Sequence, residues 1–281
     1  MASHAVTGAG LGVGDHACWR YADDDERRAV LTAYFLDGLA AGERLVYFGR
    51  RGTEDALDDH LAAHCDVAAL RASGRLLVEA AEDAYLPGGT FDPDARIRAY
   101  ELLVRDSLAA GYPAVRVFGD AATVAATLAD LRIWTEYELR AELLAARLPI
   151  VGLCGYDLRH WGDRPFHRID AAHHHALGDE ERASAFHLHG TPAGALAVTG
   201  ELDVGSVALA RELLEVWAHD PHGTAIDLAP LAFADAAGMA EIYRTACARE
   251  DVDICDPPPL FRRAWQLLGY DDVVPLADAT P

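Results

Sequence analysis

His16 and Cys18 are the residues whose types and spacing most directly suggest chemistry. They stand two apart in a short apolar segment that predicts a strand, so both side chains face the same way, with their Cα atoms about 7 Å apart. An imidazole beside a thiol suits a soft metal, a thiol-reactive signal or a polar ligand. The alternative is that Cys18 packs as a small hydrophobe while His16 bonds a backbone carbonyl. Without further ligands at suitable spacing, the pair does not predict a zinc site.

The other histidines give no better metal site. His60 and His64 have the i, i+4 spacing of paired zinc ligands on a predicted helix, but the HExxH glutamate is missing between them. The run from His173 to His175 lies in polar, irregular sequence. We therefore predict no metal and no cofactor.

A turn in the second half of the chain is notable for two positions that have no hydroxyl group. A predicted strand at residues 224–228 leads to Asp235-Ala-Ala-Gly238, which opens an amphipathic helix. Phosphorylation needs a hydroxyl oxygen, which neither Ala236 nor Ala237 has. This turn therefore cannot be switched by phosphorylation at those two positions.

Length and charge exclude several classes of protein. The chain has 281 residues, 51% of them hydrophobic, which is enough for two domains. Its net charge is −21 and it contains no lysine, so direct binding to nucleic acid or to anionic membranes is disfavoured. Five cysteines without close pairing indicate reduced thiols, and no signal peptide or membrane span is visible. We expect a cytoplasmic protein.

Periodicity predicts an α/β fold in two parts. Five apolar runs between residues 17 and 154 alternate with helical patterns, as in a doubly wound, mainly parallel sheet. After residue 184 the order β-β-α-β-α-β-α predicts a second α/β domain with a four- to five-stranded sheet. The predicted domains are residues 1–178 and 184–281, with a linker at about 160–183.

Four segments of the first half stand in a characteristic order. They are Gly14-Asp-His-Ala-Cys-Trp-Arg-Tyr21, Leu39-Ala-Ala-Gly-Glu-Arg-Leu-Val-Tyr-Phe48, Tyr85-Leu-Pro-Gly-Gly-Thr-Phe-Asp-Pro93 and Leu153-Cys-Gly-Tyr-Asp157. Through these segments, roughly residues 11–160 resemble the MEDS sensory domain, named for methanogen and methylotroph proteins and a dichloromethane-metabolism regulator. The resemblance implies a fold similar to the RecA-like core of circadian-clock ATPases. Open α/β sheets bind ligands at the carboxyl ends of their strands. We therefore predict a sensory pocket formed by His16, Cys18, Tyr21, Asp120, Tyr156 and Asp157.

The RecA-like resemblance raises the question of nucleotide chemistry. A P-loop needs glycines and a lysine, whereas the corresponding loop here is Ala22-Asp-Asp-Asp-Glu26. Four carboxylates repel a triphosphate. Asp120, at the end of a strand, matches a magnesium-holding aspartate but is a weak signal alone. ATP hydrolysis is disfavoured, and we predict that the protein is not an enzyme.

The second half resembles the STAS domain of anti-sigma factor antagonists, through Val198-Thr-Gly-Glu-Leu-Asp203 and the segment from Thr224 to Tyr243. The resemblance implies binding to an anti-sigma factor or a kinase-type regulator, and leaves a homodimer open. The residues it places at the partner surface are Glu201, Asp203, Asp235, Ala236, Ala237, Gly238 and Met239.

We therefore expect a regulatory protein that receives a small-molecule or redox signal in its first half and binds its partner through its second half. The alternative is a nucleotide-binding or small-molecule-binding protein, or an enzyme, built on the first half, with the second half used for assembly.

Overall fold

A computed structural model describes residues 10–178, 182–249 and 252–277. The chain divides into two compact units, each contributed by three segments. Unit 1 consists of residues 1–134, 148–164 and 175–181, and unit 2 of residues 135–147, 165–174 and 182–281. The α/β class that the periodicity predicts is confirmed in both units.

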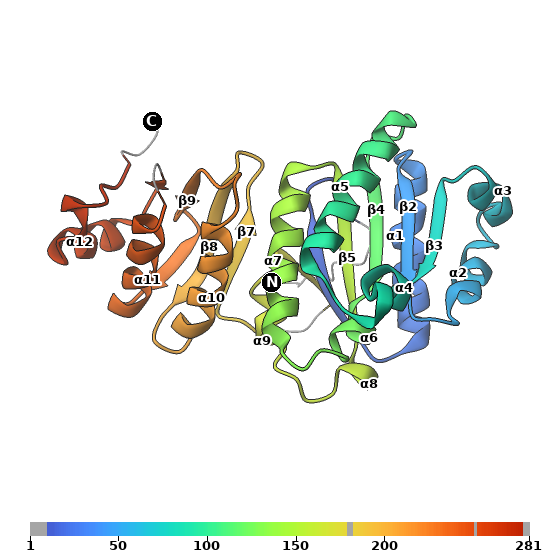
Figure 1. The fold of residues 1–281 in the computed structure, drawn as a ribbon, viewed down its shortest axis with the longest axis horizontal. Helices are drawn as coiled ribbons and strands as arrows, with labels where there is room; N and C mark the ends of the chain where they lie inside the picture. Colours follow the sequence, from blue (N-terminus) through green and yellow to red (C-terminus); the bar gives the residue numbers. More distant parts are fainter. Residues whose placement is uncertain (1–9, 179–181, 250–251, 278–281) are drawn as a thin grey trace, which may run out of the picture. The chain divides into compact units, whose positions relative to one another are not determined.

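Unit 1 is built on a six-stranded sheet in the order β3-β2-β4-β5-β1-β6, in which every neighbouring pair is parallel. Helices cover its two faces (Figure 1). The strands are β1 (His16–Tyr21), β2 (Arg44–Gly49), β3 (Leu76–Ala80), β4 (Val115–Asp120), β5 (Ile150–Asp157) and β6 (His175–Leu177). The helices are α1 (Asp24–Ala40), α2 (Glu54–Leu61), α3 (Val67–Ala72), α4 (Ala81–Tyr85), the 3-10 turn η1 (Pro87–Gly89), α5 (Pro93–Ala109), α6 (Ala121–Ala125), the first turn of α7 (Leu131–Arg147) and α8 (Leu158–Trp161).

Helix α1 shows how the sequence specifies these elements. The Asp23 carboxylate caps its first turn by accepting bonds from the N–H groups of Asp25 and Glu26. Leu31 and Phe35 repeat at helical spacing and enter the core beneath the sheet. The chain leaves the helix at Gly42, whose φ of 78° favours glycine.

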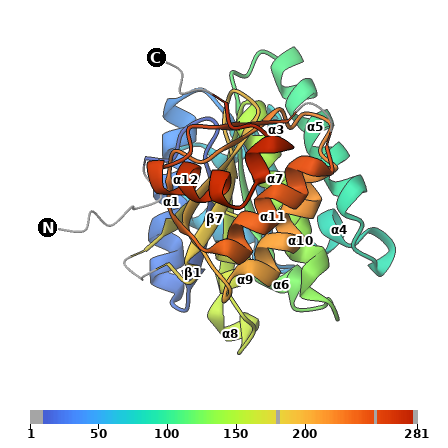
Figure 2. The same ribbon diagram turned by 90° about the vertical axis from the view of Figure 1, so that its left-hand side faces the viewer.

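Unit 2 contains a five-stranded mixed sheet with the path β10-β8-β9-β11, while β7 pairs with β8 in an antiparallel hairpin. Helices α10 and α11 lie side by side (Figure 2). The strands are β7 (Phe186–Gly190), β8 (Ala195–Leu202), β9 (Ala225–Asp227), β10 (Leu231–Ala234) and β11 (Asp253–Cys255). The helices are the remainder of α7, α9 (His167–Asp170), α10 (Val207–Ala218), α11 (Ala236–Cys247), α12 (Pro259–Leu267) and the 3-10 turn η2 (Tyr270–Asp272).

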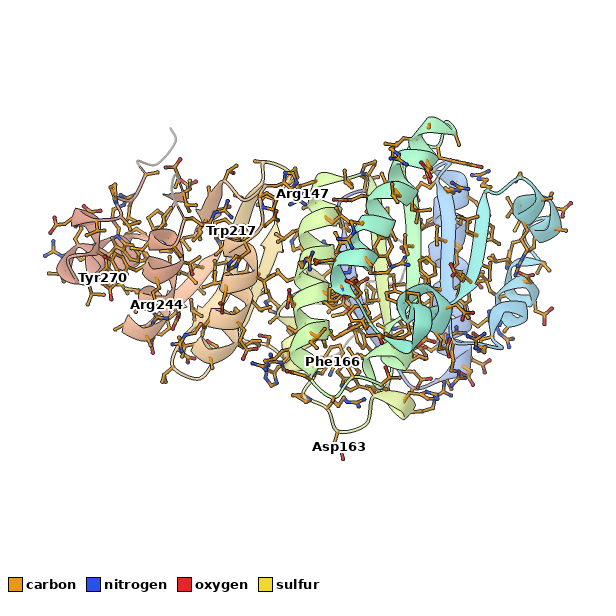
Figure 3. All side chains as sticks on the ribbon, in the orientation of Figure 1. Arg147, Asp163, Phe166, Trp217, Arg244 and Tyr270 are labelled. Atoms are coloured by element: carbon orange, nitrogen blue, oxygen red, sulfur yellow. The ribbon has the colours of Figure 1, made fainter. Side chains whose placement is uncertain are left out.

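One continuous hydrophobic core holds unit 2 together. Trp217 from α10 and Trp265 from α12 are fully buried in it, and Leu139 and Leu143 of α7 belong to the same cluster. At the C-terminal end of unit 2 lies Tyr270, which is labelled in Figure 3. Its ring stacks on that of Tyr243 with the ring centres 4.2 Å apart. Apolar burial on this scale is the main favourable contribution to folding.

Two strands were not predicted from the sequence. Residues 160–183, predicted as a linker, include α9 and β6, and β6 adds to the first sheet beside β1 through the pair Ala17 and His175. The segment from Leu231 to Ala234, which the sequence places in the approach to a turn, forms β10 parallel to β8. Both strands are too short to show a clear periodicity.

Candidate functional site

Three of the predicted pocket residues meet at the carboxyl edge of the first sheet. Tyr21 ends β1, Asp120 ends β4 and Asp157 ends β5, and Tyr21 is the direct neighbour of Asp157 across the parallel pair. All three are buried. Open α/β folds bind ligands at this edge.

A buried cation that the sequence analysis did not identify completes this group. Arg27, from the first turns of α1, donates a hydrogen bond of 2.5 Å to the Tyr47 hydroxyl, and its guanidinium lies 5.9 Å from the centre of the Phe118 ring. The Tyr47 hydroxyl is also 3.2 Å from the Thr53 Oγ1 atom. The available signal was helical spacing, because Arg27 precedes the buried Leu31 by four residues.

The electrostatics of this edge are set by burial and by Arg27. Burial raises the pKa of the Asp120 carboxyl, and Arg27 opposes that rise, as does the hydroxyl of Thr123 at 3.0 Å. Burial also raises the pKa of the Tyr21 phenol, and the negative charges of Asp120 and Asp157 add to this rise. A buried carboxyl and a buried guanidinium close to two phenols can recognise a small polar ligand or hold a proton.

Asp157 is already engaged by the α8 segment. Its two oxygens accept bonds of 2.9 and 2.8 Å from Arg159, which also contacts Asp24. His160 Nδ1 lies 3.1 Å from the same carboxylate. Burial works against ionisation of Asp157, but the bonds from Arg159 prevail and lower its pKa. Asp157 is therefore held ionised within an ion-pair network.

The other three predicted residues belong to the opposite face of the sheet. Alternation along β1 places Tyr21 in the core beneath α1, so His16 and Cys18 face the other way. His16 Nε2 lies 3.3 Å from the Sγ of Cys154 on β5, and Tyr156 accepts a bond of 3.0 Å from Trp134. The six residues therefore form two separate groups, which corrects the predicted single pocket. Cys154 was not among the predicted site residues, although it stands in the segment Leu153-Cys-Gly-Tyr-Asp157.

The other histidines considered as metal ligands differ in their surroundings within the described residues. His60 and His64 belong to no group of three ligating side chains there. His173 donates from Nδ1 to the Ile169 carbonyl at 2.8 Å, and the His174 ring stacks on His189 with centres 4.0 Å apart.

In unit 2 the Asp235 turn and the loop after β8 form one hydrogen-bonded structure. One Asp235 oxygen caps α11 by accepting from the Gly238 N–H at 2.9 Å, and the other accepts from the Val204 N–H at 2.9 Å. Asp203 in turn accepts from the N–H groups of Gly205 and Ser206 at 2.9 and 3.1 Å. Two aspartates thus fix the shape of this surface.

The residues predicted at the partner surface differ in accessibility. Glu201 and Ala236 are exposed, and Asp203, Asp235 and Ala237 are partly exposed. Gly238 and Met239 are buried, and Met239 is part of the hydrophobic core. Their placement at the partner surface is therefore corrected, because a helix that packs on a sheet exposes one side of its first turn and buries the other.

Two exposed apolar residues beside the turn were missed. Val204 is 75% exposed, and Phe233, on β10, is 46% exposed. Both lie within a few residues of Asp203 and Asp235. Apolar side chains held on a rigid surface are typical of binding interfaces.

Comparison with known families identifies the first half of the chain. The family model described as MEDS, the methanogen/methylotroph, DcmR sensory domain, matches residues 15–175. No curated protein matches this chain. Among the described residues, no helix is long and apolar enough to cross a bilayer.

Solved structures resemble parts of the chain at low identity. The anti-sigma factor antagonist SpoIIAA in its unphosphorylated form is 22% identical over 34% of this chain and 89% of its own, with a TM-score of 0.28. The phosphorylated form of the Bacillus cell fate determinant SpoIIAA is 23% identical over 34% of this chain and 92% of its own, also with a TM-score of 0.28. The DUF1998 helicase MrfA, bound to DNA and AMPPNP, is 8% identical over 94% of this chain and 49% of its own, with a TM-score of 0.36. A likeness this distant has no implication for function.

Proposed function

We propose that this chain, which belongs to the MEDS family of sensory domains, is a non-enzymatic signalling protein that couples an input in unit 1 to partner binding by unit 2. The observation that carries the proposal is the Asp203 and Asp235 arrangement, which fixes a turn and a loop into one surface with Val204 and Phe233 exposed beside it. A surface of this kind is suited to protein recognition, because its shape is set before binding.

The partner class that fits is an anti-sigma factor or its kinase domain. The sequence resemblance to antagonist domains supports this choice. A net charge of −21 supports a protein partner over nucleic acid. We place the protein in the cytoplasm on the basis of its cysteine pattern.

Control at Ala236 or Ala237 by phosphorylation is ruled out by chemistry, since neither side chain has a hydroxyl. We propose that unit 1 supplies the control instead. The buried Arg27 and Asp120 favour a small polar ligand there, while the Asp23 carboxylate already occupies the N-terminal N–H groups of α1 that a phosphate would use.

The test is binding of the full chain to the anti-sigma-factor kinases encoded in the same genome, measured by calorimetry. Val204→Asp and Phe233→Asp should each weaken binding at least about tenfold, as for central interface residues. Val273→Asp is the matched control, because Val273 is another exposed valine and follows η2. Equal affinity of all variants would exclude this surface, and no binding to any such kinase would reject the partner class.

A further inference from the structure

Cys18 and Cys154 stand directly opposite one another in adjacent strands. They are Cα partners in the parallel pair of β1 and β5. Neighbouring strands lie about 4.7–4.9 Å apart, and disulfides join residues whose Cα atoms are about 4.4–6.8 Å apart. Both residues are buried, and neither is in a disulfide in this structure.

We propose that these two residues form a redox site, in which a small hydroperoxide oxidises Cys154 and Cys18 resolves the product to a cross-strand disulfide. The site does not depend on the partner proposed for unit 2, because His16, Cys18 and Cys154 all belong to unit 1.

His16 provides the group that activates Cys154. Its Nε2 atom lies 3.3 Å from the Cys154 Sγ, within reach of the thiol proton. The thiolate is the nucleophilic form of cysteine, and an adjacent imidazole is its usual base. The room for this imidazole comes from Gly152, since a Cβ at that position would stand 2.7 Å from the His16 ring. The pairing of β1 with β5 therefore places the His16 ring against the Cys154 thiol.

The proposed chemistry is balanced in two steps. The Cys154 thiol gives its proton to His16, and the thiolate attacks the peroxide O–O bond. An S–O bond forms, and the departing hydroxide takes the proton from His16 to leave as water. The Cys18 sulfur then attacks the Cys154 sulfur, the S–S bond forms, and the sulfenic oxygen leaves with the Cys18 proton as a second water. Two thiols lose two electrons in all, and one hydrogen peroxide molecule is reduced to two waters.

Burial makes this site selective for small oxidants. Cys18 is 1% exposed and Cys154 is 9% exposed, whereas Cys247 is exposed and Cys65 and Cys255 are partly exposed. A bulky disulfide should therefore react first at Cys247. Hydrogen peroxide should instead select Cys154, because His16 is in contact with its sulfur.

The experiment uses the full-length chain with Cys65, Cys247 and Cys255 each replaced by serine, so that one disulfide can form. After treatment with equimolar hydrogen peroxide, mass spectrometry should show the loss of two hydrogens and a peptide that links Cys18 to Cys154. With Cys18→Ser added, Cys154 should instead be trapped as a sulfenic acid by dimedone. His16→Asn should slow formation of the disulfide by about a hundredfold, the lower range for loss of a general base.

Circular dichroism checks that each variant is folded. A folded protein that forms no link between Cys18 and Cys154 would overturn the proposal, as would an unchanged rate in folded His16→Asn. Oxidation by glutathione disulfide as fast as by peroxide would overturn the selectivity. Tightly bound zinc that protects both thiols would make the site a metal site instead. Each readout concerns unit 1 chemistry, so failure here is distinct from failure to bind a kinase.

Discussion

Gly238 lies so close to Leu202 that a Cβ at residue 238 would stand 2.3 Å from the Leu202 carbonyl oxygen. The first turn of α11 therefore packs on the end of β8 at a separation that only glycine permits. This contact fixes the position of the turn that carries Ala236 and Ala237. The glycine thus has a packing role in addition to its place in the turn motif.

Replacement of Gly238 by alanine should lower the free energy of unfolding by about 1–3 kcal/mol, the usual range for overpacking. Urea unfolding followed by circular dichroism measures the effect. Gly205→Ala is the control, because the nearest atom to its added Cβ is a side-chain oxygen of Asp203 at 3.2 Å, and we expect a smaller change there. Equal effects at both positions would remove the case for close packing at Gly238.

Restoring a hydroxyl at the turn should create a phosphorylation site. Ala236 and Ala237 are the first two residues of α11, and because Ala236 is exposed and Ala237 is partly exposed, a hydroxyl at either position would be accessible to a kinase. We expect Ala236→Ser or Ala237→Ser to gain one phosphoryl group when incubated with ATP and a kinase that binds the wild type. Wild-type protein should gain none at these positions by mass spectrometry. If neither variant is modified by such a kinase, the antagonist interpretation of unit 2 loses its support.

The ion pair of Asp170 should make the free energy of unfolding depend on pH in the acidic range. Burial alone would raise the pKa of Asp170, but the bond with His187, the Arg182 charge and the Ser184 N–H hold it at about 2. A carboxyl group whose pKa is lower in the folded protein than in the unfolded chain stabilises the fold fully at pH values above its unfolded pKa of about 4. This contribution to the free energy of unfolding is lost as the pH falls through the folded pKa of about 2. Asp170→Asn should thus be less stable than wild type by at most about 2 kcal/mol at pH 6, with a smaller difference at pH 3.

Asp163→Asn is the matched control for that comparison, since Asp163 is exposed (Figure 3). Denaturant unfolding at both pH values provides the measurement. A difference between Asp170→Asn and wild type that does not shrink at pH 3 would show that the ion pair does not set the pH dependence.

Nucleotide binding should be weak or absent. Asp23 accepts from the N–H groups of Asp25 and Glu26 at 2.9 and 2.8 Å, which leaves these donors occupied. Calorimetry with Mg·ATP at micromolar protein should therefore detect no binding heat. A Kd below ~10 μM, or about −7 kcal/mol, would instead favour the small-molecule-binding or enzymatic alternative.

The sequence predicted the elements with strong patterns and missed those that depend on long-range contacts. The five apolar strands of unit 1 were recognisable, because buried strands appear in the sequence as short apolar runs between helical patterns. Strands β6 and β10 have three and four residues, and only pairing with β1 and β8 specifies them.

The candidate sites were predicted less well for a geometric reason. Each strand presents alternate residues to opposite faces, so Tyr21 and Cys18 could not share a pocket although they are close in sequence. Which residue of β5 lies opposite Cys18 depends on strand register, which the family segments alone do not give. Arg27 and Val204 were missed because a buried arginine and an exposed valine run against the usual preferences of these residues.

The register of β1 and β5 also has a consequence for the unfolded chain. A covalent bond between positions 18 and 154 would close a loop of more than a hundred residues, and loops of that length lose conformational entropy worth about 5 kcal/mol on the chain-entropy account. Oxidised protein would therefore resist heat more than reduced protein. The melting temperature of unit 1 would then report the oxidation history of the molecule.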